Sequence, residues 1–479
     1  MLQVQVKTIL LGLLLFNAGA LIGYLMTTSM RPSGTFAPPA TRKLNLDDGV
    51  VGGSNGRSSG SGSSNTDEWI GIGDGHQILE SQSAGRALRL QARLGRTHRQ
   101  AEVACDRLLA GDPAEQKKAQ QLMEHCDVPS DYRLDERMAA DSCTEIRQTY
   151  VTETMSQEEA DFPLAFSLVV FKDFYQVEKL FRAVYRPEHF YCFHVDNKSS
   201  NAFFQAVTKY ASCFPNVIVS ESRSNVNWGT FTVLEADLHC MKRLLEMSKK
   251  WRYFINLVGQ EYPLRTMREL VRILKSLNGA NNLENAGTHR GTPQLSVQLP
   301  DGSKKEIQWY KGSVHITATR GFVEYVFSSV GRQIIEHLRK HGGWPCPDET
   351  LFASLNHNPD VLKVPGADLT GLKTTDNVKQ PFLNRYKNWL FGVFGYPCLS
   401  GKAVRQICIW GIKDLPAMNK RPEFFVNKFY YNFQRLALQC MVERFWNNTL
   451  ADYRVPGLAK TQEIPLHFYT KFQFVKKHI

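Results

Sequence analysis

The amino-acid sequence predicts an α/β fold, in which helices cover both faces of a mostly parallel, doubly wound sheet. Residues 164–171 form an apolar run typical of a buried strand, residues 177–184 repeat apolar side chains at helical spacing, and a second apolar run follows at 190–195. Neighbouring parallel strands need helical crossovers of this kind. The chain has 479 residues, which is enough for such a domain even if its amino-terminal part lies outside the core.

The chain begins with a candidate membrane anchor. Residues 1–8 are expected to be a cytoplasmic tail, and the uncharged residues 9–26 a single transmembrane helix. A cleaved signal peptide is the alternative, because residues 18–20 are small enough for a peptidase. Lys7 and the free amino terminus on one side, against Arg31 on the other, favour a lumenal position for the rest of the chain.

The segment after the anchor is too polar to form a core. Residues 27–83 are rich in Ser, Gly, Thr, Pro and Asn and are expected to be a flexible, disordered stem. Residues 84–160 are expected to be a helical region, with one or two helices between 84 and 121. The main folded domain is then 161–479.

Two further strand patterns continue the sheet, at 217–220 and 253–259, and a helical stripe lies between them. In open sheets of this class ligands bind beyond the carboxyl ends of the strands. Asp196 and the segment 259–263 follow such ends and are candidate nucleotide-binding positions. A carboxylate after a strand is also common as a helix cap, so the position alone decides little.

Cysteines and sequons indicate an oxidising compartment. The chain has ten cysteines, an even number, and acceptor sites for N-glycosylation at Asn197 and Asn447. The formal charge of +12 comes from scattered Lys and Arg rather than one basic stretch, and a lumenal protein meets no nucleic acid, so no nucleic-acid partner is expected. Part of this charge can receive an anionic substrate such as a nucleotide diphosphate.

Short motifs along the chain carry a resemblance to a known family. They are 162–170, 190–196, 236–242, 255–259, 281–284, 311–313, 347–350, 404–408 and 427–429. In this order they resemble the core 2 and I-branching β-1,6-N-acetylglucosaminyltransferase family, which also includes peptide xylosyltransferases. The resemblance implies a GT-A-like fold and makes 161–479 a glycosyltransferase catalytic domain.

The resemblance also implies catalysis without a metal cofactor. The Asp-x-Asp signature that holds a divalent ion in many GT-A enzymes is missing, and no two aspartates of this chain are separated by a single residue. Fixed cations must then stabilise the leaving diphosphate. The motif match assigns this task to Arg405 and Lys428, each of which could otherwise be an ordinary surface cation.

Three carboxylates receive roles from the same match. Glu349 matches the catalytic base that takes the proton of the acceptor hydroxyl during inverting transfer, although acidic residues after Pro347 would also suit the first turn of a helix. Glu284 matches an acceptor-binding glutamate, and Asp196 a position near the uridine. Trp389 is a candidate for stacking on an acceptor sugar, with burial in the core as the alternative.

Departures from the family concern specificity. Residues 285–290 do not align with the basic acceptor-contacting segment of the family, Phe391 stands where a tyrosine is expected, and the loop from there to Cys398 is shorter. A lost hydroxyl can change substrate selection. UDP-glucose therefore stays open as a donor beside UDP-N-acetylglucosamine.

The resemblance implies a disulfide framework, since spacing alone cannot establish connectivity. The implied pairs are Cys105 with Cys440, Cys143 with Cys213, Cys192 with Cys240, and Cys398 with Cys408. Cys126 and Cys346 remain, either as a fifth bridge or as two buried thiols. A zinc site is not expected, because close Cys-x-x-Cys spacing is lacking.

Taken with its resemblance, the sequence predicts a Golgi-membrane, single-pass type II enzyme with a lumenal catalytic domain. It would transfer N-acetylglucosamine from UDP-GlcNAc in β-1,6 linkage to a mucin-type O-glycan on a glycoprotein, such as core 1 Gal-β-1,3-GalNAc. The alternatives are a glucosyl- or xylosyltransferase on the same scaffold, and a catalytically silent glycan-binding protein.

Overall fold

A computed structural model describes residues 82–92, 102–125, 133–289, 291–341, 346–374, 381–390, 396–455, 458–460 and 463–479. These residues belong to one compact unit, Ile70–Ile479. The expected tail and anchor, and nearly all of the expected stem, lie outside them. Among the described helices none is long and apolar enough to span a bilayer.

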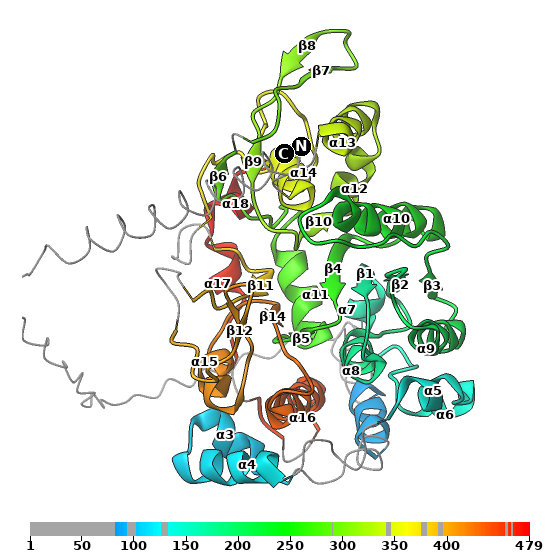
Figure 1. The fold of residues 1–479 in the computed structure, drawn as a ribbon, viewed down its shortest axis with the longest axis vertical. Coiled ribbons are helices and arrows are strands. Elements are labelled where there is room, and N and C mark those ends of the chain that lie inside the picture. Colours follow the sequence, from blue (N-terminus) through cyan, green and yellow to red (C-terminus); the bar gives the residue numbers. More distant parts are fainter. Residues whose placement is uncertain are drawn as a thin grey trace, which may run out of the picture. The chain divides into compact units, whose positions relative to one another are not determined.

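A five-stranded sheet forms the centre of the unit (Figure 1). Its order is β10 (Thr317–Thr319), β4 (Tyr253–Val258), β1 (Leu164–Val170), β2 (Phe190–Val195) and β3 (Val217–Val219). The last four strands are mutually parallel, and β10 is antiparallel to β4. The prediction of an α/β fold with a mostly parallel sheet is therefore confirmed, and each predicted strand is found within one residue of its expected end.

Alternate residues of β1 explain why helices cover both faces. Phe166 and Leu168 pack in one hydrophobic cluster, whereas Ala165 packs in another. The first cluster contains apolar residues of α8 (Phe174–Val184), α9 (Asn201–Ser212) and α11 (Met267–Ser276). The second contains those of α10 (Phe231–Met247), α12 (Arg320–Val326), α13 (Ser329–His341) and α14 (Pro347–Asn356). The period-two alternation of a strand thus builds a doubly wound sheet.

Smaller sheets of short strands accompany the main sheet. A three-stranded sheet has the order β11 (Arg385–Tyr386), β14 (Phe425–Asn427) and β5 (Glu261–Pro263). The other short strands in the described part of the chain form antiparallel pairs. They are β12 (Ala403–Val404) with β13 (Ile407–Cys408), β6 (Gly287–Thr288) with β9 (Tyr310–Lys311), and β7 (Ser296–Gln298) with β8 (Lys304–Glu306). Such short strands have no periodicity that the sequence could reveal.

The amino-terminal region is helical but more broken than expected. A helix spans 82–92, and α3 (Cys105–Ala110) and α4 (Pro113–His125) follow. The chain breaks between them because Gly111 adopts a φ of 86° and a proline opens α4. Three more short helices lead to β1: α5 (Asp135–Ala139), α6 (Cys143–Gln148) and α7 (Gln157–Ala160).

The carboxyl-terminal region closes the fold. It contains η1 (Ile412–Asp414), α15 (Leu415–Asn419), α16 (Arg435–Asp452), α17 (His467–Thr470) and α18 (Gln473–Lys476). The structure contains the four disulfides that the resemblance implies: Cys105–Cys440, Cys143–Cys213, Cys192–Cys240 and Cys398–Cys408. The first of these joins α3 to α16. Cys126 lies outside the described residues, and Cys346 carries a free, buried thiol.

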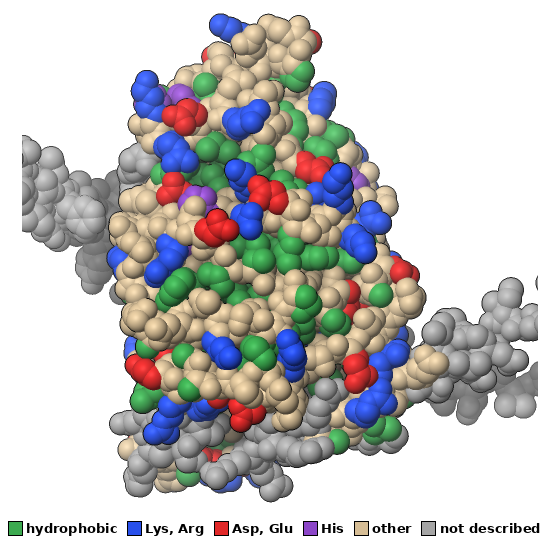
Figure 2. Space-filling model, turned by 90° about the vertical axis from the view of Figure 1, so that its right-hand side faces the viewer, with side chains coloured by type: hydrophobic (Ala, Val, Ile, Leu, Met, Phe, Trp, Pro, Cys, Tyr) green, Lys and Arg blue, Asp and Glu red, His purple; other side chains and the backbone are tan. Residues whose placement is uncertain are grey.

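Charged side chains of both signs are interspersed on the surface that Figure 2 shows. Lys and Arg do not gather there into one dense basic patch, which agrees with their scattered positions in the sequence.

Candidate active site

A cavity of about 960 Å³ opens beyond the carboxyl ends of the parallel strands. Val170, Asp196 and Val258 line it from the ends of β1, β2 and β4, and Gly259 and Gln260 continue that wall. The structure thus places Asp196 and the start of the segment 259–263 at one cavity, as their positions after strands predict. Its size is sufficient for a nucleotide.

Asp196 is held by local hydrogen bonds. Its carboxylate accepts from the backbone N–H of Lys198 at 2.9 Å and from Lys198 Nζ at 3.0 Å, and the residue is 5% exposed. Lys198 also donates to the backbone oxygen of Val226, which joins this turn to the loop before α10. Lys198 lines the cavity as well and was not singled out in the sequence.

Arg405 lines the same cavity from the tip of the β12–β13 hairpin. Arg405 and Gln406 form its two-residue loop, with φ angles of 52° and 65°. Two positive φ angles are the geometry of a type I′ turn, which normally selects Asn or Gly. The guanidinium lies 4.9 Å from the ring centre of Trp228, a second cavity residue that sequence patterns did not reveal.

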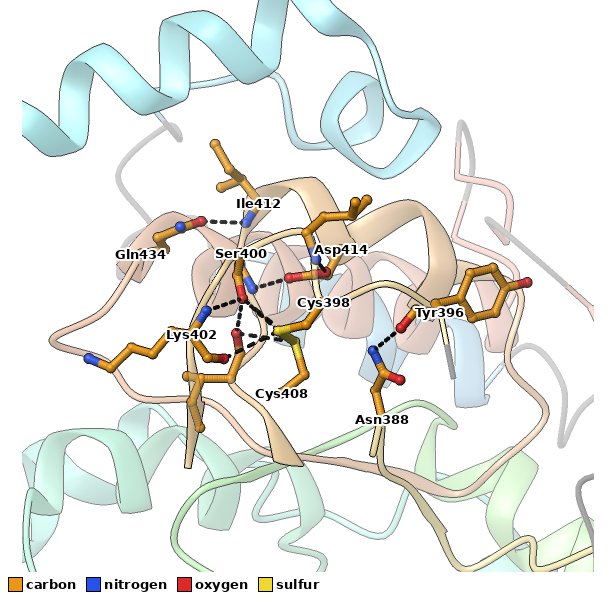
Figure 3. The surroundings of a disulfide bond; sticks show 12 residues. Asn388, Tyr396, Cys398, Ser400, Lys402, Cys408, Ile412, Asp414 and Gln434 are labelled. Carbon is orange, nitrogen blue, oxygen red and sulfur yellow. Dashed lines mark hydrogen bonds between the residues drawn. A yellow bond between two sulfur atoms is a disulfide. The ribbon is translucent and has the colours of Figure 1, made fainter. Parts of the chain in front are cut away.

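The Cys398–Cys408 disulfide braces this hairpin (Figure 3). Ser400 Oγ donates to the backbone oxygen of Ile409 at 2.6 Å, and Asp414 accepts from the backbone N–H groups of Leu399 and Gly411. These bonds fix the segment that carries Arg405. An unusual backbone conformation can persist because the surrounding contacts determine it.

Lys428 lies close to Arg405. It follows β14 directly, and its backbone oxygen accepts from Trp410 N–H at 3.1 Å, just beyond the Arg405 hairpin. Burial, then the charges of Arg405 and Lys387, lower the pKa of Lys428 to about 8. Two cations that repel each other in a partly buried place favour an anionic ligand between them.

Glu349 lies in the first turn of α14, where a negative charge also favours the helix dipole, as the alternative structural role predicts. Its Oε2 lies 3.3 Å from Lys311 Nζ, and its side chain is 25% exposed. The neighbouring Asp348 is 6% exposed, and its Oδ1 has no hydrogen-bond partner among the described residues. Burial and the charge of Glu349 raise the pKa of Asp348 to about 7.

Gly312 lies close to the backbone of both Glu284 and Glu349. Gly312 donates its N–H to the backbone oxygen of Glu349 at 2.8 Å, and a Cβ at this glycine would come within 2.3 Å of the backbone oxygen of Glu284. A side chain at position 312 would therefore push the segment of Gly312 away from the segment of Glu284. The glycine brings the predicted acceptor-binding and catalytic glutamates to the same place.

Lys387 directly follows β11, and its Nζ donates to Ser313 Oγ at 3.1 Å. Burial lowers its pKa, and the charges of Glu284 and Glu349 oppose that shift. Its charge also lowers the pKa of Lys428. Neither Lys387 nor Lys311 received a role from the sequence, although Lys311 lies in one of the family-like motifs. A lone lysine at the end of a two-residue strand gives no signal on its own.

A buried polar group supports this edge of the fold. Glu261 pairs with Arg385 Nε at 3.0 Å and accepts from Asn427 Nδ2 at 3.1 Å, so it links β5, β11 and β14. Burial, then the charges of Lys387, Arg385 and Lys428, hold the pKa of His315 well below its usual value. His315 therefore stays neutral beside Glu261, at an Nε2–Oε1 distance of 3.3 Å.

Trp389 is at the surface rather than in the core. Its side chain is 45% exposed, and Lys387 Nζ lies 5.9 Å from its ring centre. It forms an isolated antiparallel bridge with Ile407, which places it beside the Arg405 hairpin. The alternative of a buried core tryptophan is wrong, and the exposed ring is open to a sugar face.

The remaining predicted positions are placed as follows. Asn197 is exposed next to Asp196. Asn447 is half-buried within α16, and Thr449 of the same sequon is fully buried. Phe391 lies outside the described residues. Among the residues that the structure does describe, no three His, Cys, Asp or Glu side chains converge as a metal site would require.

Comparisons with known proteins identify the family of this chain. The family model for the core-2/I-branching enzyme matches residues 164–419. A beta-1,3-galactosyl-O-glycosyl-glycoprotein beta-1,6-N-acetylglucosaminyltransferase of Homo sapiens is 32% identical over 393 residues, which cover 73% of this chain and 86% of that protein.

Two further relatives have related names. The N-acetyllactosaminide beta-1,6-N-acetylglucosaminyl-transferase of Homo sapiens is 31% identical over 343 residues, covering 67% of this chain and 82% of its own. The beta-1,3-galactosyl-O-glycosyl-glycoprotein beta-1,6-N-acetylglucosaminyltransferase 4 of Mus musculus is 33% identical over 320 residues. These cover 62% of this chain and 68% of that protein. This chain is therefore a glycosyltransferase and belongs to the core-2/I-branching enzyme family.

Proposed function

We propose that the protein transfers N-acetylglucosamine from UDP-GlcNAc to an O-glycan, with core 1 Gal-β-1,3-GalNAc as the favoured acceptor and a β-1,6 linkage in the product. The names of its relatives support the donor and the linkage. The observation that carries the proposal is the cluster of Glu349, Lys387, Lys428 and Arg405. Gly312 donates its N–H to the backbone oxygen of Glu349, and the adjacent Ser313 accepts from Lys387 Nζ. Lys387 and Lys428 follow the paired strands β11 and β14, and Trp410 N–H, beside the Arg405 hairpin, donates to the Lys428 backbone oxygen. A GT-A-type fold agrees with the parallel sheet.

The chemistry divides between two ends of the cluster. At one end the acceptor hydroxyl attacks the anomeric carbon of the donor, and Glu349 takes its proton. At the other end the bond from that carbon to the diphosphate oxygen breaks, and Arg405 and Lys428 receive the developing negative charge. Attack opposite the leaving group inverts the anomeric centre. Asp196 contributes to nucleotide binding, and Glu284 and Trp389 to acceptor binding.

The proposal includes a reaction without a divalent ion and a Golgi location. Fixed cations at the diphosphate can take over the charge stabilisation that a metal supplies elsewhere. A single-pass type II anchor at residues 9–26 would place the catalytic domain in the lumen. The disulfides and the exposed sequon at Asn197 suit that compartment.

The test incubates a purified lumenal portion beginning before residue 82 with UDP-GlcNAc, UDP-glucose or UDP-xylose and a core 1 acceptor, with chelator present. The expected product is a branched trisaccharide formed from UDP-GlcNAc alone, with a β-1,6 linkage by NMR. Preferential transfer of glucose or xylose would contradict the donor, and a different linkage would contradict the reaction. Absence of transfer with every donor would contradict the proposal as a whole.

A further inference from the structure

The ring of Trp228 lies against the guanidinium of Arg405. The Cζ atom of Arg405 is 4.9 Å from the centre of the Trp228 ring, which is the geometry of a cation–π contact. Arg405 is exposed at the tip of the β12–β13 hairpin, so the strand pairing fixes its backbone but leaves its long side chain with several rotamers. The ring favours those rotamers that keep the guanidinium at the cavity, which both residues line.

The backbone of Trp228 is fixed on both sides, although the residue is 54% exposed. Before it, Asn227 accepts from Thr230 Oγ1 at 2.8 Å through its backbone oxygen, and its N–H donates to Thr232 Oγ1 at 2.9 Å. After it, Gly229 adopts a φ of 80°, which turns the chain into α10 and which a residue with a Cβ rarely adopts. Trp228 is therefore an exposed ring on a rigid support.

The same loop is tied to the nucleotide end of the cavity. Lys198 Nζ donates to the backbone oxygen of Val226 at 2.6 Å and to the carboxylate of Asp196 at 3.0 Å. All three residues line the cavity together with Trp228 and Arg405. A continuous series of contacts thus leads from the end of β2, through the loop before α10, to the guanidinium.

We propose that Trp228 is a positioning residue, whose ring holds the Arg405 guanidinium over the cavity in the orientation that receives the diphosphate of the donor. This inference rests on the proposed role of Arg405 at the diphosphate. A side chain that is ordered before the ligand arrives loses less entropy on binding, so the affinity for the ligand rises. Trp228 touches neither reacting atom in this role.

Stacking of the Trp228 ring on the uracil base is the alternative role that the test has to separate. The cavity offers a second exposed ring for comparison, because Phe171 is 43% exposed and also lines it. Its neighbouring cation is Lys198, with Nζ 6.0 Å from the ring centre, rather than Arg405. Phe171 is therefore a matched control for an aromatic ring at this cavity.

The test is a double-mutant cycle of UDP affinity, measured by calorimetry on the wild type, Trp228→Ala, Arg405→Met and the double variant. Trp228→Ala is expected to weaken UDP binding about two- to fivefold, as for the loss of an exposed cation–π contact. In the Arg405→Met background the same substitution is expected to cause no further loss. The losses of Phe171→Ala and Arg405→Met, in contrast, are expected to multiply.

Two single variants test whether the π face is what matters. Trp228→Phe keeps an aromatic face and is expected to recover most of the UDP affinity, whereas Trp228→Leu keeps apolar bulk alone and is expected to bind UDP like Trp228→Ala. If Trp228→Ala does not fold, the comparison of these two variants carries the test. Equal UDP affinities of the phenylalanine and leucine variants would overturn the inference.

Uridine, which lacks the diphosphate, separates positioning from base stacking. Its competition against bound UDP gives a uridine affinity that is expected to be equal in the wild type and Trp228→Ala. A weaker uridine affinity in the variant, or an equal loss of UDP affinity with and without Arg405, would overturn the inference.

Arg405→Met alone separates this inference from the proposed function. If that variant binds UDP as tightly as the wild type, Arg405 is misassigned and the proposed function loses its diphosphate cation. If that variant binds UDP more weakly while the effects of Trp228→Ala and Arg405→Met multiply, the inference about Trp228 alone fails.

Discussion

Lys387 and Lys428 follow two adjacent parallel strands, β11 and β14; Lys387 Nζ donates to Ser313 Oγ, and the Lys428 backbone oxygen accepts from Trp410 N–H beside the Arg405 hairpin. Burial lowers the pKa of Lys387, and burial with the charge of Arg405 lowers the pKa of Lys428 to about 8. These contacts place Lys428 next to the Arg405 hairpin, which lines the cavity beyond the parallel strands.

UDP affinity is expected to depend on the protonation of Lys428. Burial and the charge of Arg405 lower the pKa of this lysine to about 8, so its ammonium group loses its proton as the pH rises through that value. Calorimetry should show UDP binding weaken above pH 8, by up to about tenfold for each pH unit. Lys428→Arg stays charged and should show a flatter profile.

A matched control for this measurement is Lys413→Met, which removes an exposed lysine of η1 outside the cavity lining. It should follow the wild-type curve. An affinity of the wild type that does not change between pH 7 and 9, or an arginine variant with the same slope, would contradict the assignment of Lys428 to the diphosphate.

The Cys398–Cys408 bridge is expected to serve the site more than the fold. Its loop spans a sequence separation of 10, so the double variant Cys398→Ser/Cys408→Ser should lose less than about 3 kcal/mol of unfolding free energy. Because the bridge holds the hairpin of Arg405, UDP affinity should fall clearly at a temperature where the variant stays folded.

The control double variant removes Cys143 and Cys213, a bridge with a sequence separation of 70 between α6 and the end of α9. It should cost more stability but leave UDP affinity unchanged in the folded protein. Equal effects of both double variants on UDP binding would show that the hairpin bridge has no special relation to Arg405.

Trp389→Ala is expected to weaken acceptor binding selectively. The exposed indole can stack on a sugar, and loss of such a contact should raise the acceptor KM by roughly five- to fiftyfold, equivalent to about 1 to 2 kcal/mol, while the UDP affinity stays the same. Leu390→Ala is the matched control, since Leu390 is adjacent and 46% exposed. A similar change of KM in both variants would argue against a specific role of the ring.

Asp348 is expected to make folding stability depend on pH. Burial and Glu349 raise its folded-state pKa to about 7, whereas an unfolded aspartate titrates near 3.9. The folded protein therefore binds the Asp348 proton more tightly than the unfolded chain does. As the pH rises from about 4 to 7 this contribution to the unfolding free energy is lost.

The comparison of Asp348→Asn with the wild type isolates this effect. Denaturant titration gives the unfolding free energy of each protein. The value for Asp348→Asn minus the value for the wild type should increase by about 2 to 3 kcal/mol between pH 5 and 8. A difference that is constant across this range would mean that Asp348 is ionised in the folded protein like an ordinary aspartate.

The sequence predicts the sheet well because strong local patterns specify it. The strands β1, β2 and β4 are apolar runs between helical stripes, and Asp196 follows one of them. Buried strands that alternate with helices have few alternative arrangements. Between 84 and 121 one or two helices were expected, whereas the structure has three, with a break at Gly111.

The sequence could not predict how the site is assembled. Arg405 occupies a conformation that Arg seldom adopts, and flanking pairs and a disulfide impose it. Lys387 and Lys428 become neighbours through the pairing of β11 with β14, which are strands of two and three residues without periodicity. The roles of Glu349, Glu284, Lys428 and Arg405 stay predictions from a resemblance, because no local pattern marks residues that are far apart in the sequence.

The most direct test of the central claim compares the wild type with Glu349→Gln in the presence of chelator, with transfer and UDP binding measured on the same preparations. We expect the wild type to transfer sugar to the acceptor, and the variant to bind UDP equally well but to transfer at least about a hundredfold more slowly. Transfer by the variant at the wild-type rate, or wild-type activity that vanishes with chelator and returns with a divalent ion, would contradict it.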